Sequence, residues 1–153
     1  MIIFFDIDHT LSDAFHRDGM IEDVMTDWDQ YHAESIHDEP IPAMASLVRL
    51  LNETRNSFAP GTTLVGLTAR PEKWRALTMR WLVQHEIPLT HLLMRADDDY
   101  RPAKELKLDL ARGFVAPHAL EDVPGVIVID DREDVVMAFN AIGIVGLQAF
   151  TRR

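Results

Sequence analysis

The sequence predicts an α/β fold in which helices cover both faces of a parallel β-sheet. Two observations indicate this class. Short apolar runs typical of buried strands alternate along the chain with longer segments in which apolar residues recur at helical spacing. Several of these runs also end in acidic residues, as expected at the carboxyl edge of a parallel sheet, where ligands bind.

The first half of the chain contains two predicted strands and two predicted helices. Residues 2–7 form a short apolar run that ends in carboxylates, which indicates a buried strand. Apolar residues at helical spacing predict a helix over residues 42–55. A Pro-Gly pair introduces a second strand over residues 63–68, and helical spacing predicts a helix over residues 71–85. The inner side of this helix carries two expected core residues, Trp74 and Trp81.

The second half continues the alternation. A weaker apolar run predicts a strand over residues 91–94, and helical spacing predicts a helix over residues 103–114. Another Pro-Gly pair precedes a strand over residues 126–129. Residues 135–142 are predicted to form a helix, and residues 144–147 a last short strand.

Residues 12–39 interrupt this alternation between the first strand and the first long helix. The segment is rich in Asp, Glu and His, and its main large apolar residues are Trp28 and Tyr31. It is too short to be a domain of its own, so we expect a small lid or cap. Trp28 is expected to anchor this lid, with a platform for base stacking as the alternative. Surface positions are expected for its three histidines, His16, His32 and His37, which lack metal-ligand spacing.

Length and composition fit one globular domain. With 153 residues, no internal repeat and no Gly/Ser linker, residues 1–153 are predicted to form a single domain. The absence of cysteine excludes disulfides, cysteine metal sites and thiol catalysis. A net charge of −10 argues against stable binding of duplex DNA. No apolar run is long enough to cross a membrane and the N-terminus lacks signal-peptide features, so we expect a cytoplasmic protein without a membrane partner.

Three predicted strand ends carry the residues of a candidate site. These residues are Asp6 and Asp8 after the first strand, Thr68 and Arg70 after the second, and Asp130 and Asp131 after the fourth. Acidic groups at such ends meet in one crevice, where leaving them unpaired costs several kcal/mol. A cation is their natural partner, and hard oxygen ligands without His or Cys favour Mg²⁺ over zinc.

This set of side chains suits phosphoryl transfer. A carboxylate can attack phosphorus to form an aspartyl-phosphate, which divides hydrolysis into two easier steps. A second carboxylate two residues away can protonate the leaving oxygen and later activate water. A metal ion and a lysine can neutralise charge on the equatorial phosphate oxygens, and Thr68 and nearby backbone amides could hold one of them.

Four segments resemble the motifs of the haloacid dehalogenase-like (HAD) phosphohydrolases in order and position: DIDHTL, LTAR, a downstream lysine and VIDD. The resemblance covers nearly the whole chain and implies a three-layer, Rossmann-like fold. It implies Asp6 as the nucleophile, Asp8 as the general acid/base and Thr68 as a phosphate ligand. It also implies that Mg²⁺ is bound by the Asp6 carboxylate, the Asp8 carbonyl and Asp130, with Asp131 assisting.

A closer resemblance concerns the second and third motifs. LTARPEKWRALTMRWLVQHEIP and LLMRADDDYRPAKELKLDLA resemble the phosphatase domain of polynucleotide kinase/phosphatases of the kind that phages encode. In that pattern a lysine lies six residues after an arginine, and counting from Arg101 selects Lys107 over Lys104, one turn earlier. No G-x-x-x-x-G-K-[ST] motif occurs, so the kinase half is missing and we expect a stand-alone phosphatase module.

Three further residues are candidate substrate contacts, and two positions depart from the family pattern. Ala69, Arg70 and Arg101 are the candidate contacts. Pairing with a surface carboxylate is the alternative for Arg70, and an Arg–Asp loop network with residues 97–99 is the alternative for Arg101. His9 and Ala69 stand where the family usually has glycine. His9 tolerates unusual backbone angles better than a β-branched residue and could place a side chain at the mouth of the site.

The sequence therefore predicts a Mg²⁺-dependent phosphatase that works through an aspartyl-phosphate on nucleotides or polynucleotide 3′-phosphate ends. If the protein is phage-encoded, it would act in the host cytoplasm. The alternative is a phosphatase for mononucleotides, like a 5′-nucleotidase, or for another small metabolite, which the acidic surface favours. A non-catalytic binding module is the third hypothesis, and the intact motif residues argue against it.

Overall fold

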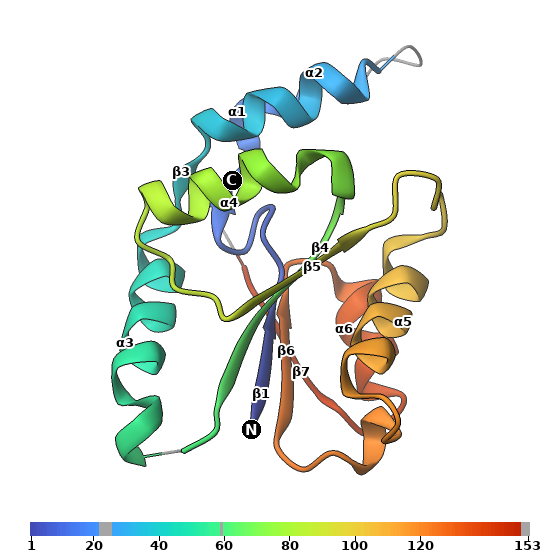
Figure 1. Ribbon diagram of the computed structural model, residues 1–153. Helices are drawn as coiled ribbons and strands as arrows, with labels where there is room; N and C mark the ends of the chain where they lie inside the picture. Colours follow the sequence, from blue (N-terminus) through green and yellow to red (C-terminus); the bar gives the residue numbers. More distant parts are fainter. Residues whose placement is uncertain (22–25, 59, 151–153) are drawn as a thin grey trace.

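In the computed structural model, which describes residues 1–21, 26–58 and 60–150, five parallel strands form a central sheet (Figure 1). The strands lie in the order β5–β4–β1–β6–β7, and each neighbouring pair is parallel. Their bounds are β1 Ile2–Phe5, β4 Thr63–Pro71, β5 His91–Arg95, β6 Val126–Asp130 and β7 Val145–Gln148. The predicted α/β class with a parallel sheet is confirmed.

Helices cover both faces of this sheet, which confirms the three-layer architecture (Figure 1). One face carries α3 (Pro42–Phe58) and α4 (Arg75–Gln84). The other face carries α5 (Ala103–Val115) and α6 (Glu133–Asn140). A 3-10 turn, η3 (Leu120–Asp122), lies between α5 and β6.

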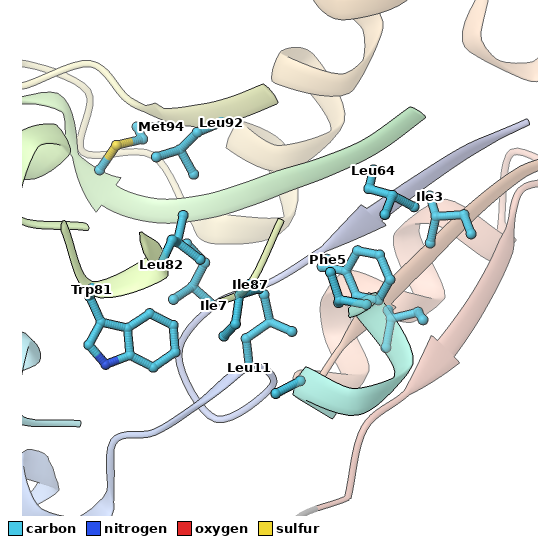
Figure 2. Close-up of a cluster of buried hydrophobic side chains, with 13 residues drawn as sticks. Ile3, Phe5, Ile7, Leu11, Leu64, Trp81, Leu82, Ile87, Leu92 and Met94 are labelled. Carbon is cyan, nitrogen blue, oxygen red and sulfur yellow. The ribbon is translucent and has the colours of Figure 1, made fainter. Parts of the chain in front are cut away.

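The side chains of β1 alternate between two hydrophobic cores, one on each face. Ile3 and Phe5 lie in a core with α3 and α4, whereas Phe4 lies in a core with α5 and α6. Trp81 of α4 is fully buried in the first core, as predicted (Figure 2). Trp74 lies before α4 and is only half-buried, so its predicted core position is wrong. Because both faces are covered, the carboxyl edge is the natural place for a ligand.

The second motif lies within a strand that is longer than predicted. β4 continues to Pro71, whose ψ of 148° is extended, and the 3-10 turn η2 (Glu72–Trp74) separates it from α4. The helix predicted over residues 71–85 therefore begins late. A residue before proline is disfavoured in the helical region, which keeps Arg70 in the strand. Thr68, Ala69 and Arg70 are thus held on an element of the sheet.

Between β1 and α3 the chain leaves the three-layer core, in the part of the sequence where an insertion is predicted over residues 12–39. A two-residue antiparallel pair, β2 (Ser12–Asp13) with β3 (Glu39–Pro40), joins its two ends. Between them lie α1 (Phe15–Asp18), α2 (Trp28–Ala33) and the 3-10 turn η1 (Glu34–His37). Figure 1 shows α1 and α2 beyond the carboxyl ends of the strands. In the part of the chain that the structure describes, no helix is long and apolar enough to cross a membrane.

Candidate active site

The turn after β1 aims two carboxylates at the carboxyl edge of the sheet. The Asp6 amide donates to the Ile129 carbonyl at 2.9 Å, which continues the β1–β6 pairing by one residue. The Ile7 carbonyl then accepts hydrogen bonds from the next turn. His9 has a φ of 59°, the left-handed conformation for which the family usually uses glycine. Asp6 and Asp8 are two residues apart just after β1, and both line a cavity at this edge of the sheet.

Asp6, Asp130, Asp131 and Lys107 form a group that we call the lysine cluster. The three carboxylates offer oxygen atoms that all lie within 4.8 Å of one another. The Lys107 ammonium lies 2.7 Å from Asp6 Oδ1 and 2.6 Å from Asp130 Oδ2. Lys107 is buried, whereas Lys104 is exposed on the same helix, so only Lys107 reaches these carboxylates.

The lysine cluster carries more negative than positive charge. Burial raises the pKa of Asp6 well above its usual value, Lys107 opposes this, and neighbouring carboxylates add to it. Burial and the neighbouring Asp130 likewise raise the pKa of Asp131. Burial alone would lower the pKa of Lys107, but Asp6 and Asp130 raise it, so the ammonium stays charged. Three close carboxylates around one ammonium fit a hard divalent cation such as Mg²⁺.

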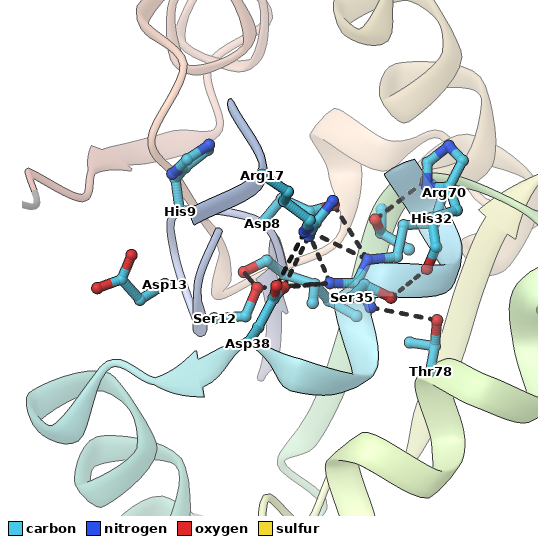
Figure 3. Close-up of polar contacts among 12 residues, drawn as sticks. Asp8, His9, Ser12, Asp13, Arg17, His32, Ser35, Asp38, Arg70 and Thr78 are labelled. Carbon is cyan, nitrogen blue, oxygen red and sulfur yellow. Dashed lines mark hydrogen bonds and ion pairs between the residues drawn. The ribbon is translucent and has the colours of Figure 1, made fainter. Parts of the chain in front are cut away.

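Asp8, Asp38, Arg17 and Arg70 form a second group, the arginine clamp (Figure 3). Arg70 donates to both Asp8 oxygens, at 2.7 Å from Nη2 and 3.1 Å from Nε, and Arg17 Nη2 contacts the same carboxylate. Arg17 also donates to Asp38 at 2.8 Å from Nε and 2.7 Å from Nη2. Arg70 Nη2 lies 3.2 Å from Asp38 Oδ2. The clamp is therefore balanced, with two guanidiniums for two carboxylates.

The clamp fixes the charge state of Asp8. Burial alone would raise the pKa of Asp8, but the Arg70 and Arg17 guanidiniums hold it far below its usual range. His16 Nε2 lies 2.8 Å from Asp38 Oδ1, and the backbone carbonyl of Asp38 accepts a hydrogen bond from Trp81 Nε1 at 2.7 Å. Asp8 is thus an ionised carboxylate in this arrangement.

Arg17 and Asp38 are site residues that the sequence analysis missed. Both lie in the insertion, and their side chains have no exposed surface. One signal was present, because Arg17 is the only Lys or Arg between residues 12 and 39. A single cation in such an acidic segment indicates a specific carboxylate partner. The sequence spacing did not show that Arg17 lies next to Asp8 in the fold.

The structure also locates the predicted substrate contacts. Thr68 is buried, and its hydroxyl accepts a hydrogen bond from the Arg70 amide at 3.2 Å. The Arg70 side chain pairs with the partly buried Asp8 and the fully buried Asp38 rather than with a surface carboxylate. Arg101 is half-exposed and forms the alternative Arg–Asp network, with Asp99 Oδ2 at 2.8 Å and with Asp109. Ala69, Arg70 and Arg101 all line one cavity at the carboxyl edge of the sheet.

This cavity has a volume of about 780 Å³ and joins the core to the insertion. Its lining includes Asp6, Asp8, Asp131 and Lys107 from the core, and Trp28, Tyr31 and His32 from α2. Six of the 15 Lys and Arg residues of the chain line it, namely Arg70, Lys73, Arg95, Arg101, Lys107 and Arg132. The lining also holds six carboxylates, namely Asp6, Asp8, Asp29, Asp97, Asp99 and Asp131, so its formal charges balance within a protein whose net charge is −10. A second hollow of about 740 Å³, beside α3 and α4, contains none of the predicted site residues.

Two expectations for α2 are wrong. Trp28 does not anchor the insertion, because 53% of it is exposed within the cavity wall. Tyr31 is the anchor: it is buried, and the Arg17 guanidinium lies 4.3 Å from its ring centroid. His32 is buried rather than on the surface, and burial lowers its pKa to about 4. The helical repeat places both Tyr31 and His32 inward, which the polar composition of the segment obscured.

The parallel sheet and its strand-end carboxylates define a HAD-type phosphatase. Residues 1–151 match the family model described as the polynucleotide kinase PNKP phosphatase domain, and the chain belongs to this family. A search of curated protein sequences found no match.

Solved structures confirm the fold. A chain of a Pnkp1/Rnl/Hen1 complex is 24% identical with a TM-score of 0.69, over 96% of this chain and 45% of that one. A chain of the Pnkp1/Rnl/Hen1 RNA repair complex is 22% identical with a TM-score of 0.74, over 96% and 41%. A putative phosphatase from Clostridium difficile is 17% identical with a TM-score of 0.68, over 96% and 83%. This chain thus spans less than half the length of the first two.

Proposed function

We propose that the protein is a Mg²⁺-dependent phosphomonoesterase that hydrolyses 3′-phosphate ends of polynucleotides, with Asp6 as the nucleophile. The observation that carries this proposal is the lysine cluster on the wall of a large cavity that contains six Lys and Arg side chains. There the Asp6 carboxylate, 2.7 Å from the Lys107 ammonium, faces a space large enough for a nucleotide. Membership of the PNKP phosphatase family supports the same chemistry.

The metal would be held by Asp6, Asp130 and Asp131, together with the Asp8 carbonyl. Their excess of negative charge is the feature that supports this assignment. When bound, Mg²⁺ would neutralise negative charge on these carboxylates and on the phosphate oxygens. Lys107 supplies a further fixed positive charge, and its raised pKa keeps it protonated through neutral pH.

Hydrolysis then proceeds in two steps on the side chains of this protein. In the first, an Asp6 oxygen attacks phosphorus, the phosphorus–ester oxygen bond breaks, and Asp8 protonates the leaving oxygen. In the second, water gives a proton to Asp8 and attacks the aspartyl-phosphate. Inorganic phosphate leaves, and the Asp6 carboxylate is restored. Thr68 and the amides that follow it are the proposed contacts for one phosphate oxygen.

The arginine clamp governs when Asp8 can hold a proton. With both guanidiniums in place, Asp8 is ionised, which suits its role as the base in the second step. Arg70 also lines the cavity, so an incoming phosphate dianion competes with Asp8 for this guanidinium. As Arg70 turns toward phosphate, the pKa of Asp8 rises and the carboxyl group can protonate the leaving oxygen.

Two observations favour a nucleic-acid end as the substrate. The cavity of about 780 Å³ is much larger than a phosphate group, and its lining includes cations beyond the lysine cluster, such as Lys73, Arg95 and Arg101. Structural relatives of this chain occur in a complex described as an RNA repair complex. A small metabolite would leave most of this space to water.

Phosphate release from a panel of substrates tests the proposal. The panel contains a 3′-phosphorylated oligonucleotide, 3′- and 5′-mononucleotides and a generic aryl phosphate, each with Mg²⁺ or with chelator. We expect turnover that requires Mg²⁺, fastest on the 3′-phosphorylated oligonucleotide. Turnover of mononucleotides alone would replace the end-processing function by a nucleotidase function. No turnover of any substrate at saturating Mg²⁺ would refute the phosphatase mechanism.

A further inference from the structure

Trp28 is a large aromatic side chain that the fold leaves open inside the cavity. It is 53% exposed and lines the same cavity as Asp6 and Lys107. Exposing this much apolar surface is unfavourable in water, and the packing of the insertion does not require it because Tyr31 serves as its anchor. An open indole face beside a phosphate site is suited to an aromatic group of a ligand.

The Trp28 ring is held in place from behind. It lies edge-to-face against Tyr31 with 5.6 Å between ring centroids, and the His32 ring is 6.2 Å away. His32 in turn lies 6.2 Å from the ring of Trp74 in η2. The next residue, Asp29, is bridged to Lys73, whose amide also donates to Asp97 at 2.8 Å. The platform is therefore linked to the core as well as to the insertion.

A second exposed aromatic residue, Tyr100, reaches the cavity from the loop between β5 and α5. It is 89% exposed and lines the cavity. Its loop is fixed on both sides, because Arg95 Nη1 donates to the Asp99 carbonyl at 2.8 Å and to the Arg101 carbonyl at 2.9 Å. The backbone is held while the phenol ring makes little contact with the protein. Trp28 and Tyr100 thus present two open rings to one space.

Charged side chains surround these rings, with Lys73 paired to Asp29 and Arg101 paired to Asp99, so the surroundings suit an ionic ligand such as a nucleotide better than an apolar one. Lys73 is close enough to both Asp29 and Tyr100 to interact electrostatically with them, and Arg101 follows Tyr100 directly. A nucleic-acid strand presents alternating bases and phosphates, and single-stranded sites combine aromatic rings with cations for this reason. His32, neutral because burial lowers its pKa to about 4, adds no charge beneath the Trp28 ring.

We propose that Trp28 and Tyr100 form the platform that binds the base of the substrate's terminal nucleoside while its phosphate lies against Asp6. This inference rests on the function proposed above and specifies what the site selects: a phosphoester attached to a nucleoside. Stacking is tolerant of base identity because every base has a π-face, so the platform selects for a base without selecting which one.

Binding to the Asp6→Asn background, in which hydrolysis is blocked, tests the platform directly. Two 3′-phosphorylated oligonucleotides are compared in Mg²⁺ by fluorescence anisotropy, one complete and one identical except that its 3′-terminal nucleotide is abasic. We expect the complete ligand to bind at least tenfold more tightly. Adding Trp28→Ala should raise its Kd by about 5- to 150-fold, as for loss of one stacked base. Adding Tyr100→Ala should raise it several-fold.

The matched controls separate stacking from general damage. Neither substitution should change the Kd of the abasic ligand by more than about twofold, and Trp28→Phe should keep most of the affinity for the complete ligand. Phe150→Ala removes another exposed ring, outside the cavity, and should change neither Kd. Equal weakening of both ligands by Trp28→Ala, or no weakening of either, would overturn the platform.

The outcomes for the two proposals are distinct. Base-dependent binding without phosphate release by the unmodified protein would leave the platform standing and remove the phosphatase mechanism. Phosphate release by the unmodified protein with equal binding of the complete and abasic ligands would support the phosphatase mechanism and refute the platform.

Discussion

The lysine cluster and the arginine clamp lie side by side at the carboxyl edge of the sheet, yet they balance their charges differently. The lysine cluster has three carboxylates for one ammonium, and burial and neighbouring charge raise the pKa of Asp6 within it. The clamp has two carboxylates for two guanidiniums, which lower the pKa of Asp8. A site that binds a divalent cation needs a net negative charge before the cation binds. A site that controls the protonation of a carboxyl group instead needs cationic side chains beside that group. Four changes test this distinction.

The largest expected effect is on catalysis, from Asp6→Asn. Loss of the attacking oxygen should lower kcat by about four orders of magnitude or more, measured as phosphate release under saturating substrate. Stability should be unchanged or slightly higher, because one crowded carboxylate is neutralised. Asp8→Asn is the matched variant, and it should lose stability as well as activity because it leaves two buried guanidiniums short of a partner. A highly active Asp6→Asn protein would contradict the nucleophile assignment.

The next largest effect should follow from breaking the clamp on its arginine side. Arg17→Met leaves the fully buried Asp38 with fewer partners and should lower the free energy of unfolding by about 3–5 kcal/mol, measured by urea denaturation. Arg132→Met is the control, because its pair with Asp134 is exposed and should be worth about 0–1 kcal/mol. Similar losses for the two variants would mean that the clamp has no special structural role.

The pH dependence of stability separates His32 from the carboxylates. The folded-state pKa of His32 is lowered by burial to about 4 from an ordinary value of about 6.5. As the pH falls, His32 therefore binds a proton in the unfolded chain before it does so in the folded protein. The contribution of neutral His32 to the free energy of unfolding is fully present above pH 6.5 and is lost as the pH falls to 4. The loss amounts to about 3 kcal/mol. His32→Phe should flatten the fall relative to the unmodified protein over this range, and identical pH profiles would contradict the assignment.

Asp8 contributes in a separate, more acidic range. Its folded-state pKa is lowered, so its contribution is present above the ordinary carboxyl value of about 3.9 and is lost only as pH falls below it. The difference between the unmodified protein and His32→Phe therefore reports on His32 alone between pH 6.5 and 4.

The smallest effect expected is stabilisation by Mg²⁺. At a concentration about 100 times its Kd, the ion should add about 2.7 kcal/mol to the free energy of unfolding, seen as a rise in Tm that chelator reverses. Asp130→Asn should abolish this shift, because Asp130 belongs to the lysine cluster. Arg17→Met should retain the Mg²⁺-induced rise in Tm, starting from a lower Tm, because no side chain of the clamp is a proposed metal ligand. Loss of the shift in both variants would mean that the clusters are not separable.

The fold was readable from the sequence because its signals are local. Buried strands appear as short apolar runs, and strand-end carboxylates follow them directly, so the sheet and Asp6, Asp8 and Asp130 could be located. The insertion was not readable in the same way. Arg17 contacts Asp8 across 9 residues and Asp38 across 21, and Asp38 contacts Arg70 across 32 residues. The neighbours of Arg17 and Asp38 show no helical or strand period long enough to orient these side chains.

The error over Trp28 has a related cause. Large aromatic residues are usually buried, so an anchor was the natural expectation. In a helix of only six residues, one turn decides which ring faces the core, and the neighbouring Tyr31 takes that position by stacking under Arg17. Burial of one ring then leaves the other open.

The two-residue β2–β3 pair brings the two ends of the insertion together, so the insertion forms one unit between β1 and α3. Here the unit carries Arg17 and Asp38 along with Trp28. An enzyme that acquired a different insertion would therefore inherit a new substrate preference and a new pH–rate profile together, since one segment supplies both the ring and half of the clamp. Selectivity and proton transfer in this family would then evolve as one linked trait.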